Sequence, residues 1–186
     1  MRQFRQFLVS LWSTIEVAVI AIVVVLIIRN FLFLPFSVEG ASMFPTFQNS
    51  DYLIIDELTY RFRAPMRGEV IVFRPPQNPQ DFYIKRIIGL PGETVEIKDG
   101  KVIIYNSDHP HGFVLKEDYL LDNKTPGAKK ITLGQDEYFV LGDNRVASYD
   151  SRSWGPLKKD EIIGLVRLRL YPFQSAKAFS TVDYEY

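Results

Sequence analysis

Residues 94–106 read TVEIKDGKVIIYN, two runs of strand-forming residues separated by Asp99 and Gly100. An Asp-Gly pair between two such runs is typical of a two-residue β-hairpin turn. Similar runs lie on both sides of this segment, with turn residues between them. They are DYLIID (51–56), EVIVFR (69–74), FYIKRII (82–88), EYFVL (137–141) and IIGLVRLRLY (162–171). The sequence therefore predicts a mostly β domain.

The composition excludes several kinds of chemistry. The chain has 186 residues, enough for one mid-sized domain, and its 22 Lys and Arg residues balance 22 Asp and Glu residues. This balance argues against nucleic acid as a partner. The chain has no cysteine, which rules out disulfides, thiolate metal sites and cysteine nucleophiles. Catalysis by this chain would therefore use oxygen or nitrogen groups.

The N-terminal segment differs from the rest of the chain. Residues 8–28 read LVSLWSTIEVAVIAIVVVLII and are uninterrupted apolar from Val17 onward. As a helix these residues reach about 31 Å, close to the hydrocarbon thickness of a bilayer. Arg2 and Arg5 precede the segment and only Arg29 follows it directly, which favours a cytoplasmic N-terminus. We therefore expect a single-pass protein of the cell membrane.

Residues 1–34 are accordingly predicted as a cytoplasmic N-terminus with one transmembrane helix, and residues 35–186 as an extracytoplasmic β domain. A buried helix of a soluble protein is a weaker alternative, because such helices keep a polar face. A cleaved secretory signal is also weaker, because its apolar core is about 7 to 15 residues long and the cleavage site follows closely. Here residues 29–38 separate the apolar stretch from the small residues Gly40 and Ala41.

The last predicted strand has an alternating pattern. Val166, Leu168 and Leu170 alternate with Arg167 and Arg169. A strand with one face on the core has this period of two. We therefore expect the three apolar side chains to face the core and the two arginines to face solvent.

Two segments lack strand patterns. Residues 107–130 are polar and rich in turn residues, and we expect a loop or a small appended subdomain there, within a smaller subdomain near residues 96–135. Residues 174–186 contain no second apolar span and are predicted to lie on the surface.

Ser42 is the first candidate for chemistry. It lies in VEGASMFPT (38–46), where Gly40 and Ala41 would let a substrate backbone approach closely. Pro45 favours an extended conformation at the residue before it. A serine hydroxyl becomes a good nucleophile only when a base removes its proton. Taken by itself, this segment more often forms an ordinary turn.

Lys85 is the second candidate, because it lies inside a predicted strand. Alternation places Tyr83, Lys85 and Ile87 on one face and Arg86 on the other. Burial disfavours an ammonium group, so a lysine held against Tyr83 and Ile87 could act as a neutral base. The alternative is an edge-strand lysine that extends to solvent.

The third candidate is the segment LGDNRVASYDSR (141–152), which follows a predicted strand and carries many hydrogen-bonding side chains. Asp150 and Arg152 could form an ion pair, and residues 142–144 could form only a tight turn. Alone, this segment does not separate a catalytic role from a structural one.

Together these three segments resemble the type I signal peptidases, membrane-anchored serine proteases that remove signal peptides from exported proteins. The resemblance rests on SMFPT (42–46), YIKR (83–86) followed by GLPGE (89–93), and GDNR (142–145) with the residues up to Arg152. It implies that Ser42 is the nucleophile, Lys85 the general base, and Ser148 a hydroxyl that holds the Lys85 amine. The resemblance also implies supporting roles for Asp143, Arg145, Asp150 and Arg152.

The same resemblance implies a fold and a substrate site. The expected fold is mostly β, with a catalytic core of two coiled antiparallel sheets and a small β subdomain, preceded by one transmembrane helix. Some members have a serine two residues before the nucleophile that helps to bind the oxyanion, whereas this chain has Gly40. The backbone N–H of Ser42, with help from Gly40 or water, would then bind the oxyanion. The implied pocket walls are Phe36, Val38, Met43, Tyr83, Ile84, Val140 and Leu141.

The implied partners are signal peptides of exported preproteins and the lipid bilayer, with no cofactor and no metal; the oligomeric state stays open. Two histidines, His109 and His111, make a poor metal site without a third ligand, but either could complete a Ser-His-Asp triad with Ser42. A membrane-tethered, non-enzymatic β-domain that binds envelope partners is the main alternative. A self-cleaving repressor protease would need a DNA-binding helical domain in place of the apolar segment.

Overall fold

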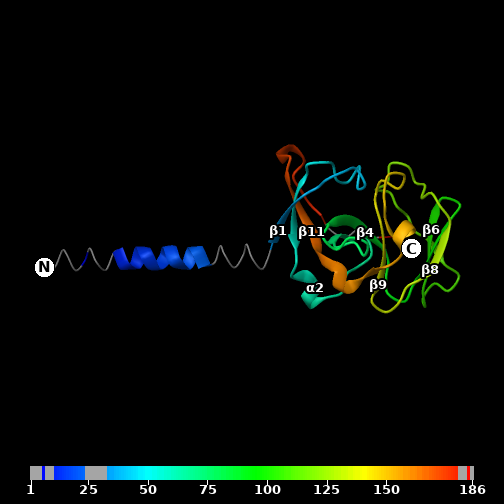
Figure 1. Ribbon diagram of the computed structural model, residues 1–186, viewed down its shortest axis with the longest axis horizontal. Coiled ribbons are helices and arrows are strands. Elements are labelled where there is room, and N and C mark those ends of the chain that lie inside the picture. Colours follow the sequence, from blue (N-terminus) through cyan, green and yellow to red (C-terminus); the bar gives the residue numbers. More distant parts are fainter. Residues whose placement is uncertain (1–5, 7–10, 24–32, 180–183, 185–186) are drawn as a thin grey trace.

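The computed structural model describes residues 6, 11–23, 33–179 and 184 (Figure 1). Residues 11–23 are helical. Within the described part of the chain, no helix combines the length and the apolar character needed to cross a membrane. Part of the predicted span at 8–28 lies outside the described residues.

An eight-stranded antiparallel sheet forms most of the domain (Figure 1). Its strands are β1 (Phe33–Ser37), β2 (Tyr52–Asp56), β3 (Val70–Phe73), β4 (Tyr83–Gly89), β9 (Glu137–Leu141), β10 (Leu157–Lys158), β11 (Ile162–Tyr171) and β12 (Lys177–Ala178). They follow the order β1-β2-β11-β3-β4-β9-β10, with β12 paired to β11. Short helical turns connect them: α2 (Thr59–Phe62), α3 (Ser151–Trp154), η1 (Lys159–Glu161) and η2 (Phe173–Ser175).

A second sheet has four strands in the order β7-β6-β5-β8. These strands are β5 (Thr94–Lys98), β6 (Lys101–Tyr105), β7 (Phe113–Val114) and β8 (Lys129–Thr132). The predicted hairpin is present as β5 and β6, and its turn residues Asp99 and Gly100 have φ values of 52° and 77°. Both central residues of a type I′ turn need a positive φ, which an Asp-Gly pair tolerates. The local sequence thus determines this hairpin.

The mostly β prediction is confirmed, and two details differ. The large sheet is one continuous, curled sheet rather than the two coiled sheets that the resemblance implied. β7 and the start of β8 lie within residues 107–130, where the sequence showed no strand pattern. β7 has only two residues, too few to produce a detectable alternation.

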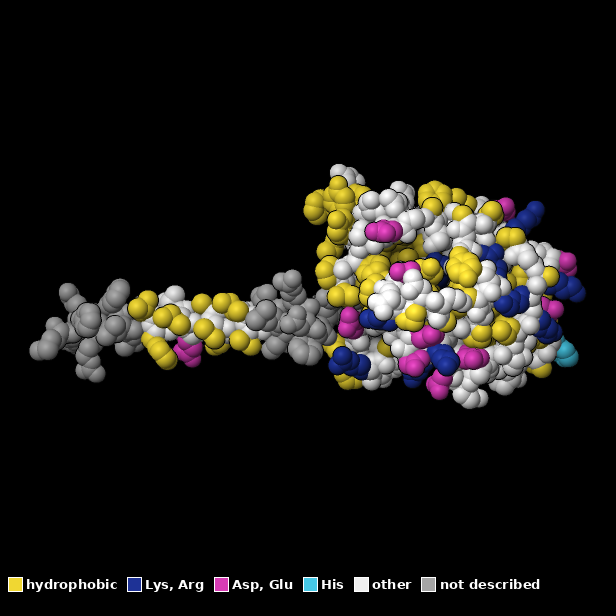
Figure 2. All heavy atoms as spheres, in the orientation of Figure 1, with side chains coloured by type: hydrophobic (Ala, Val, Ile, Leu, Met, Phe, Trp, Pro, Cys, Tyr) yellow, Lys and Arg dark blue, Asp and Glu magenta, His cyan; other side chains and the backbone are white. Residues whose placement is uncertain are grey.

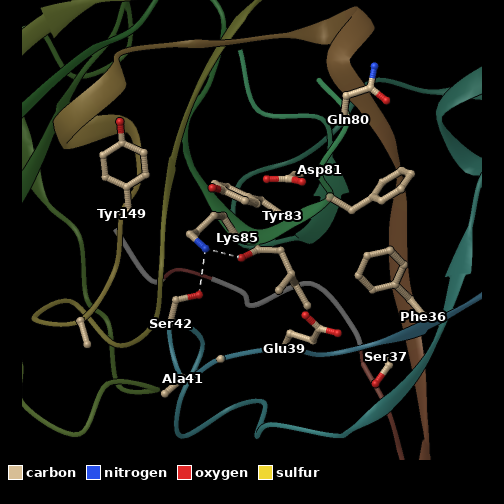
Figure 3. A pocket seen from close by; sticks show the side chains of 14 residues that line it. Phe36, Ser37, Glu39, Ala41, Ser42, Gln80, Asp81, Tyr83, Lys85 and Tyr149 are labelled. Atoms are coloured by element: carbon tan, nitrogen blue, oxygen red, sulfur yellow. Dashed lines mark hydrogen bonds between the residues drawn. The ribbon is translucent and has the colours of Figure 1, made fainter. Parts of the chain in front are cut away.

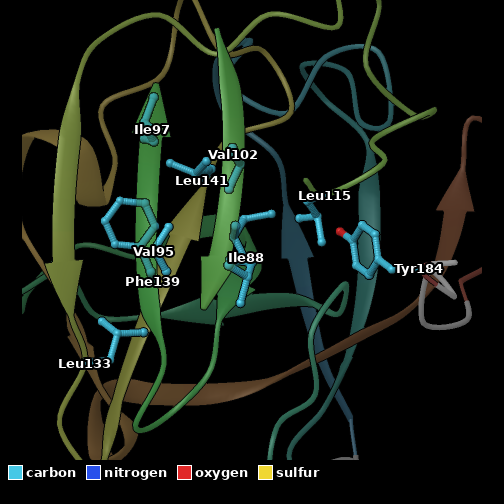
Figure 4. Close-up of a cluster of buried hydrophobic side chains, with 10 residues drawn as sticks. Ile88, Val95, Ile97, Val102, Leu115, Leu133, Phe139, Leu141 and Tyr184 are labelled. Atoms are coloured by element: carbon cyan, nitrogen blue, oxygen red, sulfur yellow. The ribbon is translucent and has the colours of Figure 1, made fainter. Parts of the chain in front are cut away.

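β4 takes part in all three hydrophobic clusters of the domain. Ile84 packs with residues of β2, β3 and β11, Ile87 packs with residues of β3, β9 and β10, and Ile88 packs with residues of β5, β6 and β9. Figure 4 shows the third cluster, in which Ile88 meets Val95 and Phe139 between the two sheets. From the second residue to the last, every residue of β4 is buried. Polar side chains on this strand are therefore removed from water.

The alternation predicted for β11 is wrong at its C-terminal end. Val166 is buried, but Leu168 and Leu170 are 37% and 46% exposed. The pairing of β11 with β2 shifts register between Val166 and Leu168 and again after Arg169. Each shift changes which face the following residues occupy. Arg169 is instead half-buried and donates from Nη1 to Oδ2 of Asp51, 2.9 Å away.

The prediction of a surface tail is wrong at Tyr184. Its side chain is buried in the cluster between the sheets (Figure 4). The hydroxyl oxygens of Tyr184 and Tyr119 lie 3.1 Å apart, and the two rings meet edge to face. The tail also contains Phe179, which packs against Phe47. Neither aromatic residue belongs to a periodic pattern that would reveal its contact.

Candidate active site

The predicted nucleophile and base lie side by side. Ser42 lies in a turn that follows β1, and Lys85 lies on β4. The Nζ atom of Lys85 is within hydrogen-bond distance of Ser42 Oγ, at 2.9 Å, and it donates to the carbonyl oxygen of Ile84, at 2.8 Å (Figure 3). The two side chains meet in a cleft, although 43 positions separate them in the sequence. A hydroxyl and an amine in this contact can exchange a proton.

The surroundings of Lys85 favour its neutral form. The side chain is only 4% exposed. Burial lowers the pKa of Lys85 from 10.5 to about 8, and the charges of Asp150 and Asp143 oppose this change. A substantial fraction of the amine is therefore neutral near pH 8, as a general base requires.

The loop after β9 packs directly behind Ser42. The backbone N–H of Asn144 donates to the Ser42 carbonyl at 2.9 Å, and its side-chain Nδ2 donates to the Ala41 carbonyl at 3.1 Å. A Cβ atom on Gly142 would lie 2.4 Å from the Ser42 carbonyl oxygen and 2.2 Å from Ser148 Oγ. Glycine is therefore required at position 142 for the loop to approach the nucleophile this closely.

Asp143 joins this loop to the strand that carries Lys85. Its carboxylate accepts from Arg86 Nε at 2.9 Å and from Arg86 Nη2 at 2.6 Å, and both residues are buried. Asp143 also accepts from Thr46 Oγ1 at 2.5 Å. Burial opposes the positive charge of Arg86, but the Asp143 carboxylate outweighs it and raises the pKa of Arg86. The paired charges hold the nucleophile turn, the loop and β4 together.

Asp150 anchors the other end of the loop. It is fully buried, and its carboxylate accepts from Arg152 Nε and Nη2, each at 2.8 Å, and from the Gly142 N–H at 3.1 Å. It also caps α3 by accepting from the backbone N–H of Arg152. The resemblance implied this ion pair, and Asp150 and Arg152 form it in the structure.

Arg145 joins the same loop to the small sheet. The resemblance implied a supporting role for Arg145 without naming its partner. Its guanidinium donates to the Glu117 carboxylate and to Thr125 Oγ1, and its Nε donates to the Gly142 carbonyl. Glu117 lies between β7 and β8 of the small sheet. Arg145 therefore ties the catalytic loop to the second sheet, and Arg86 is the partner of Asp143.

Ser148 does not hold Lys85 in this structure. Its Oγ is buried and has no hydrogen-bond partner. The carbonyl of Ile84 accepts from Lys85 instead. The predicted hydrogen bond between Ser148 and Lys85 is therefore not formed here, since Ser148 Oγ packs against Gly142.

Gly40 does not offer its N–H to an oxyanion. That N–H donates to Oδ1 of Asn49 at 2.9 Å. Gly40 has a φ of 89°, and a Cβ atom there would meet no atom within 4 Å. Gly40 thus shapes the cleft wall, and the Ser42 N–H is left as the backbone donor from the predicted pair.

The cleft beside Ser42 and Lys85 has a volume of about 660 Å³. Three predicted wall residues, Phe36, Tyr83 and Ile84, line it. Val38 and Met43 are buried in the cluster behind Ile84. Val140 and Leu141 do not line the cleft, because β9 runs inside the sheet and both side chains are fully buried in two hydrophobic clusters.

Neither histidine belongs to the cleft. His109 and His111 lie between β6 and β7, and His109 packs edge to face on Phe113. Across residues 6, 11–23, 33–179 and 184, no three His, Asp or Glu side chains converge in a geometry that could hold a metal ion.

Three functional contacts were missed in the sequence. The partner of Asp143 is Arg86, the partner of Arg145 is Glu117, and Thr46 supports the nucleophile turn. Arg86 gave a usable signal, since a charged residue between Ile84 and Ile87 in a buried strand needs a counter-charge. Glu117 gave none, because it lies in a polar segment with several other acids.

Comparisons with known proteins identify the family of this chain. The sequence profile of the family described as "Signal peptidase, peptidase S26" matches residues 11–171. The chain is 38% identical over 171 residues to signal peptidase I P of Bacillus subtilis subsp. natto, covering 86% of this chain and 88% of that protein. It is 37% identical over 159 residues to probable signal peptidase I-2 of Synechocystis sp., covering 83% of this chain and 70% of that protein.

A crystal structure of a signal peptidase I from Enterococcus faecalis V583 aligns with a TM-score of 0.48 and 34% identity, over 55% of this chain and 97% of the other. The assignment rests on the sequence comparisons, which extend over most of the described domain. The chain belongs to the signal peptidase family, peptidase S26.

Proposed function

We propose that this protein is a membrane-anchored serine endopeptidase that removes N-terminal signal peptides from exported preproteins. Ser42 is the nucleophile and neutral Lys85 is the general base. The observation that carries the proposal is the 2.9 Å contact between Lys85 Nζ and Ser42 Oγ, made by a lysine that is buried without a carboxylate partner in hydrogen-bond contact. Family membership supplies the substrate class.

The geometry supports a stepwise acyl transfer. Neutral Lys85 accepts the Ser42 hydroxyl proton while Oγ attacks the carbonyl carbon of the scissile peptide bond. The Ser42 N–H donates to the oxyanion of the tetrahedral intermediate. The protonated amine of Lys85 then gives its proton to the leaving nitrogen. Water, deprotonated by Lys85, hydrolyses the acyl ester and restores the Ser42 hydroxyl.

The cleft walls support binding of an extended peptide. The segment leading from β1 to Ser42 forms one wall, and the segment leading into β4 forms the other. A peptide that lies between them places alternate side chains against Ile84, which lines the cleft and has Val38 and Met43 buried behind it. Bulky residues in these positions leave little room, which fits small side chains one and three residues before the cut.

Two observations support a location at the membrane. The first is the apolar sequence of residues 8–28. The other is an apolar patch of exposed side chains near the end of β11, made by Tyr52, Leu168, Leu170, Tyr171 and Phe173. Figure 2 shows hydrophobic side chains gathered at this corner, on the side of the domain where β1 begins. We propose that the patch faces the lipid bilayer, with the catalytic domain extracytoplasmic.

The decisive experiment incubates detergent-solubilised protein with a preprotein and compares the wild type with Ser42→Ala. The proposal expects a product whose new N-terminus follows a small residue, and no product from Ser42→Ala. A preprotein with Phe at the position before the cut should be refused. A tethered, non-enzymatic β-domain would give no product from either protein, and that result would overturn the proposal.

A further inference from the structure

The cleft is negatively charged at its surface. The Asp, Glu, Lys and Arg residues that line it are Glu39, Asp81 and Lys85 (Figure 3). Lys85 is buried and faces Ser42, whereas the other two side chains are exposed. The nearby Arg74 does not line the cleft, because its guanidinium lies over the Phe82 ring and donates to the Pro79 carbonyl. A substrate entering the cleft therefore meets two carboxylates.

Glu39 is held in place by its backbone and free at its carboxylate. The preceding residue, Val38, donates its N–H to the Asp51 carbonyl at 2.9 Å and accepts from the Ser50 N–H at 2.8 Å. Within the described part of the chain, the Glu39 carboxylate has no hydrogen bond or ion pair. Asp81, in contrast, accepts from Nδ2 of Asn78 at 2.8 Å. Glu39 is thus the cleft carboxylate whose two oxygens both lack a hydrogen-bond partner within the described residues, and both can bind a substrate cation.

The position of Glu39 places it near the substrate side chain two residues before the cut. Val38 is buried in the hydrophobic cluster behind the cleft, whereas Glu39, the next residue, is exposed and lines the cleft. In an extended peptide, neighbouring side chains point to opposite sides. If the side chains one and three residues before the cut face the wall that contains Ile84, the side chain between them points to the exposed side, where Glu39 lies.

We infer that Glu39 is a specificity-determining residue that favours a basic side chain two residues before the cut and disfavours an acidic one. This inference rests on the proposed function and adds the charge of the preferred substrate. Electrostatic complementarity of this kind acts on specificity more than on raw affinity. Exposed ion pairs are weak, so changing substrate Lys to Glu should alter kcat/KM by roughly tenfold.

The test uses three peptides that differ only at this position, with Lys, Gln or Glu. The kcat/KM of each is measured with the wild type, Glu39→Gln and Glu39→Lys. We expect the wild type to prefer Lys over Glu by roughly tenfold. Glu39→Gln should bring this ratio close to one, and Glu39→Lys should reverse it. Raising the salt from about 0.1 M to about 1 M shortens the Debye length to roughly 3 Å and should weaken the preference.

Asp81→Asn is the matched control, because it removes one charge from the same cleft. The ratio of kcat/KM for the Lys peptide to that for the Glu peptide should be unchanged in Asp81→Asn. If Asp81→Asn and Glu39→Gln lower this ratio equally, the preference comes from the net negative charge of the cleft, and the specific role of Glu39 is overturned. A wild-type ratio near one would overturn the inference while leaving the proposed function intact. Failure of the wild type to cleave even the Gln peptide would instead count against the proposed function.

Discussion

Lys85 and Arg86 are neighbours on β4, and each is 4% exposed, yet their surroundings give them opposite properties. Arg86 points to a buried carboxylate that binds it through two nitrogens. The Nζ atom of Lys85 is in hydrogen-bond contact with a hydroxyl and a carbonyl oxygen and lies 5.5 Å from the centre of the Tyr83 ring. Burial without a directly bound counter-charge lowers the pKa of Lys85, whereas Asp143 raises the pKa of Arg86. Equal burial thus produces a base on one face of the strand and a permanent cation on the other.

The largest expected effect comes from removing the base. Lys85→Met should lower kcat by about 10³-fold or more, and Ser42→Ala should do the same, because each removes half of one proton-transfer unit. Lys85→Arg should be equally inactive, since a guanidinium stays protonated. The double variant should be little worse than either single variant. Single-turnover cleavage measures the loss, and an unchanged thermal unfolding midpoint for Ser42→Ala serves as the control.

Substantial residual cleavage by Lys85→Met would contradict the dyad. His109→Ala would then be the next variant to measure.

Removing the cation on the other face should act on stability. Arg86→Met leaves the Asp143 carboxylate buried without its ion-pair partner, which should lower the free energy of unfolding by about 3–5 kcal/mol. Arg86→Met with Asp143→Leu removes both charges and should restore part of this loss. Urea unfolding of the catalytic domain in detergent measures both changes. Equal stability of Arg86→Met and the wild type would mean that the pair contributes nothing to the fold.

The pH dependence of kcat/KM tests whether Lys85, unlike Arg86 on the other face of β4, loses its proton near neutral pH. Lys85 must be neutral to accept a proton, so kcat/KM should rise with pH and reach half its maximum near pH 8. The charge of Asp150 raises the pKa of Lys85, so Asp150→Asn should move this midpoint to lower pH. A pH–rate profile measures the shift. A midpoint that moves to higher pH would contradict the assignment.

The same pKa predicts the sign of a stability change. Between pH 8 and 10.5 the unfolded chain keeps the Lys85 proton that the folded chain has lost. The free energy of unfolding should therefore rise with pH across this window, and Lys85→Met should remove that contribution. Urea unfolding at several pH values gives the comparison.

The smallest expected effect concerns a buried hydroxyl that lacks a partner. Ser148→Ala removes no hydrogen bond, so the free energy of unfolding should change by less than about 1 kcal/mol. Urea unfolding beside Arg86→Met gives the comparison. A loss of several kcal/mol would show that Ser148 has a strong interaction in solution.

The sequence predicted those strands and turns that depend on residues adjacent in the chain. The β5–β6 hairpin followed from Asp99 and Gly100, and β4 followed from its run of strand-forming residues. The residue pattern did not give the bounds of β1, because Pro35 interrupts it, although a proline is tolerated in a strand at the sheet edge. The face assignment of Leu168 failed because a bulge depends on pairing with a distant strand.

For the active site, the family resemblance identified the two central residues, but the sequence did not identify the ion-pair partners of Asp143 and Arg145. Ser42 and Lys85 were assigned from a family resemblance, because no spacing rule relates residues 43 positions apart. The Arg86–Asp143 and Arg145–Glu117 pairs depend on contacts across 57 and 28 positions. Their partners are chosen by the tertiary fold among many charged residues, so sequence patterns do not identify them.

The place of β4 at the junction of three hydrophobic clusters has a consequence for hydrogen exchange. To expose the backbone amides of Ile84, Ile87 and Ile88, the protein must open all three clusters together. These amides should therefore exchange with solvent deuterium only through global unfolding, whereas the amides of the β10 and β12 edges exchange through local fraying. Brief heating that frays only the sheet edges should therefore leave Lys85 in position on β4. Loss of activity on heating should then coincide with cooperative unfolding of the domain.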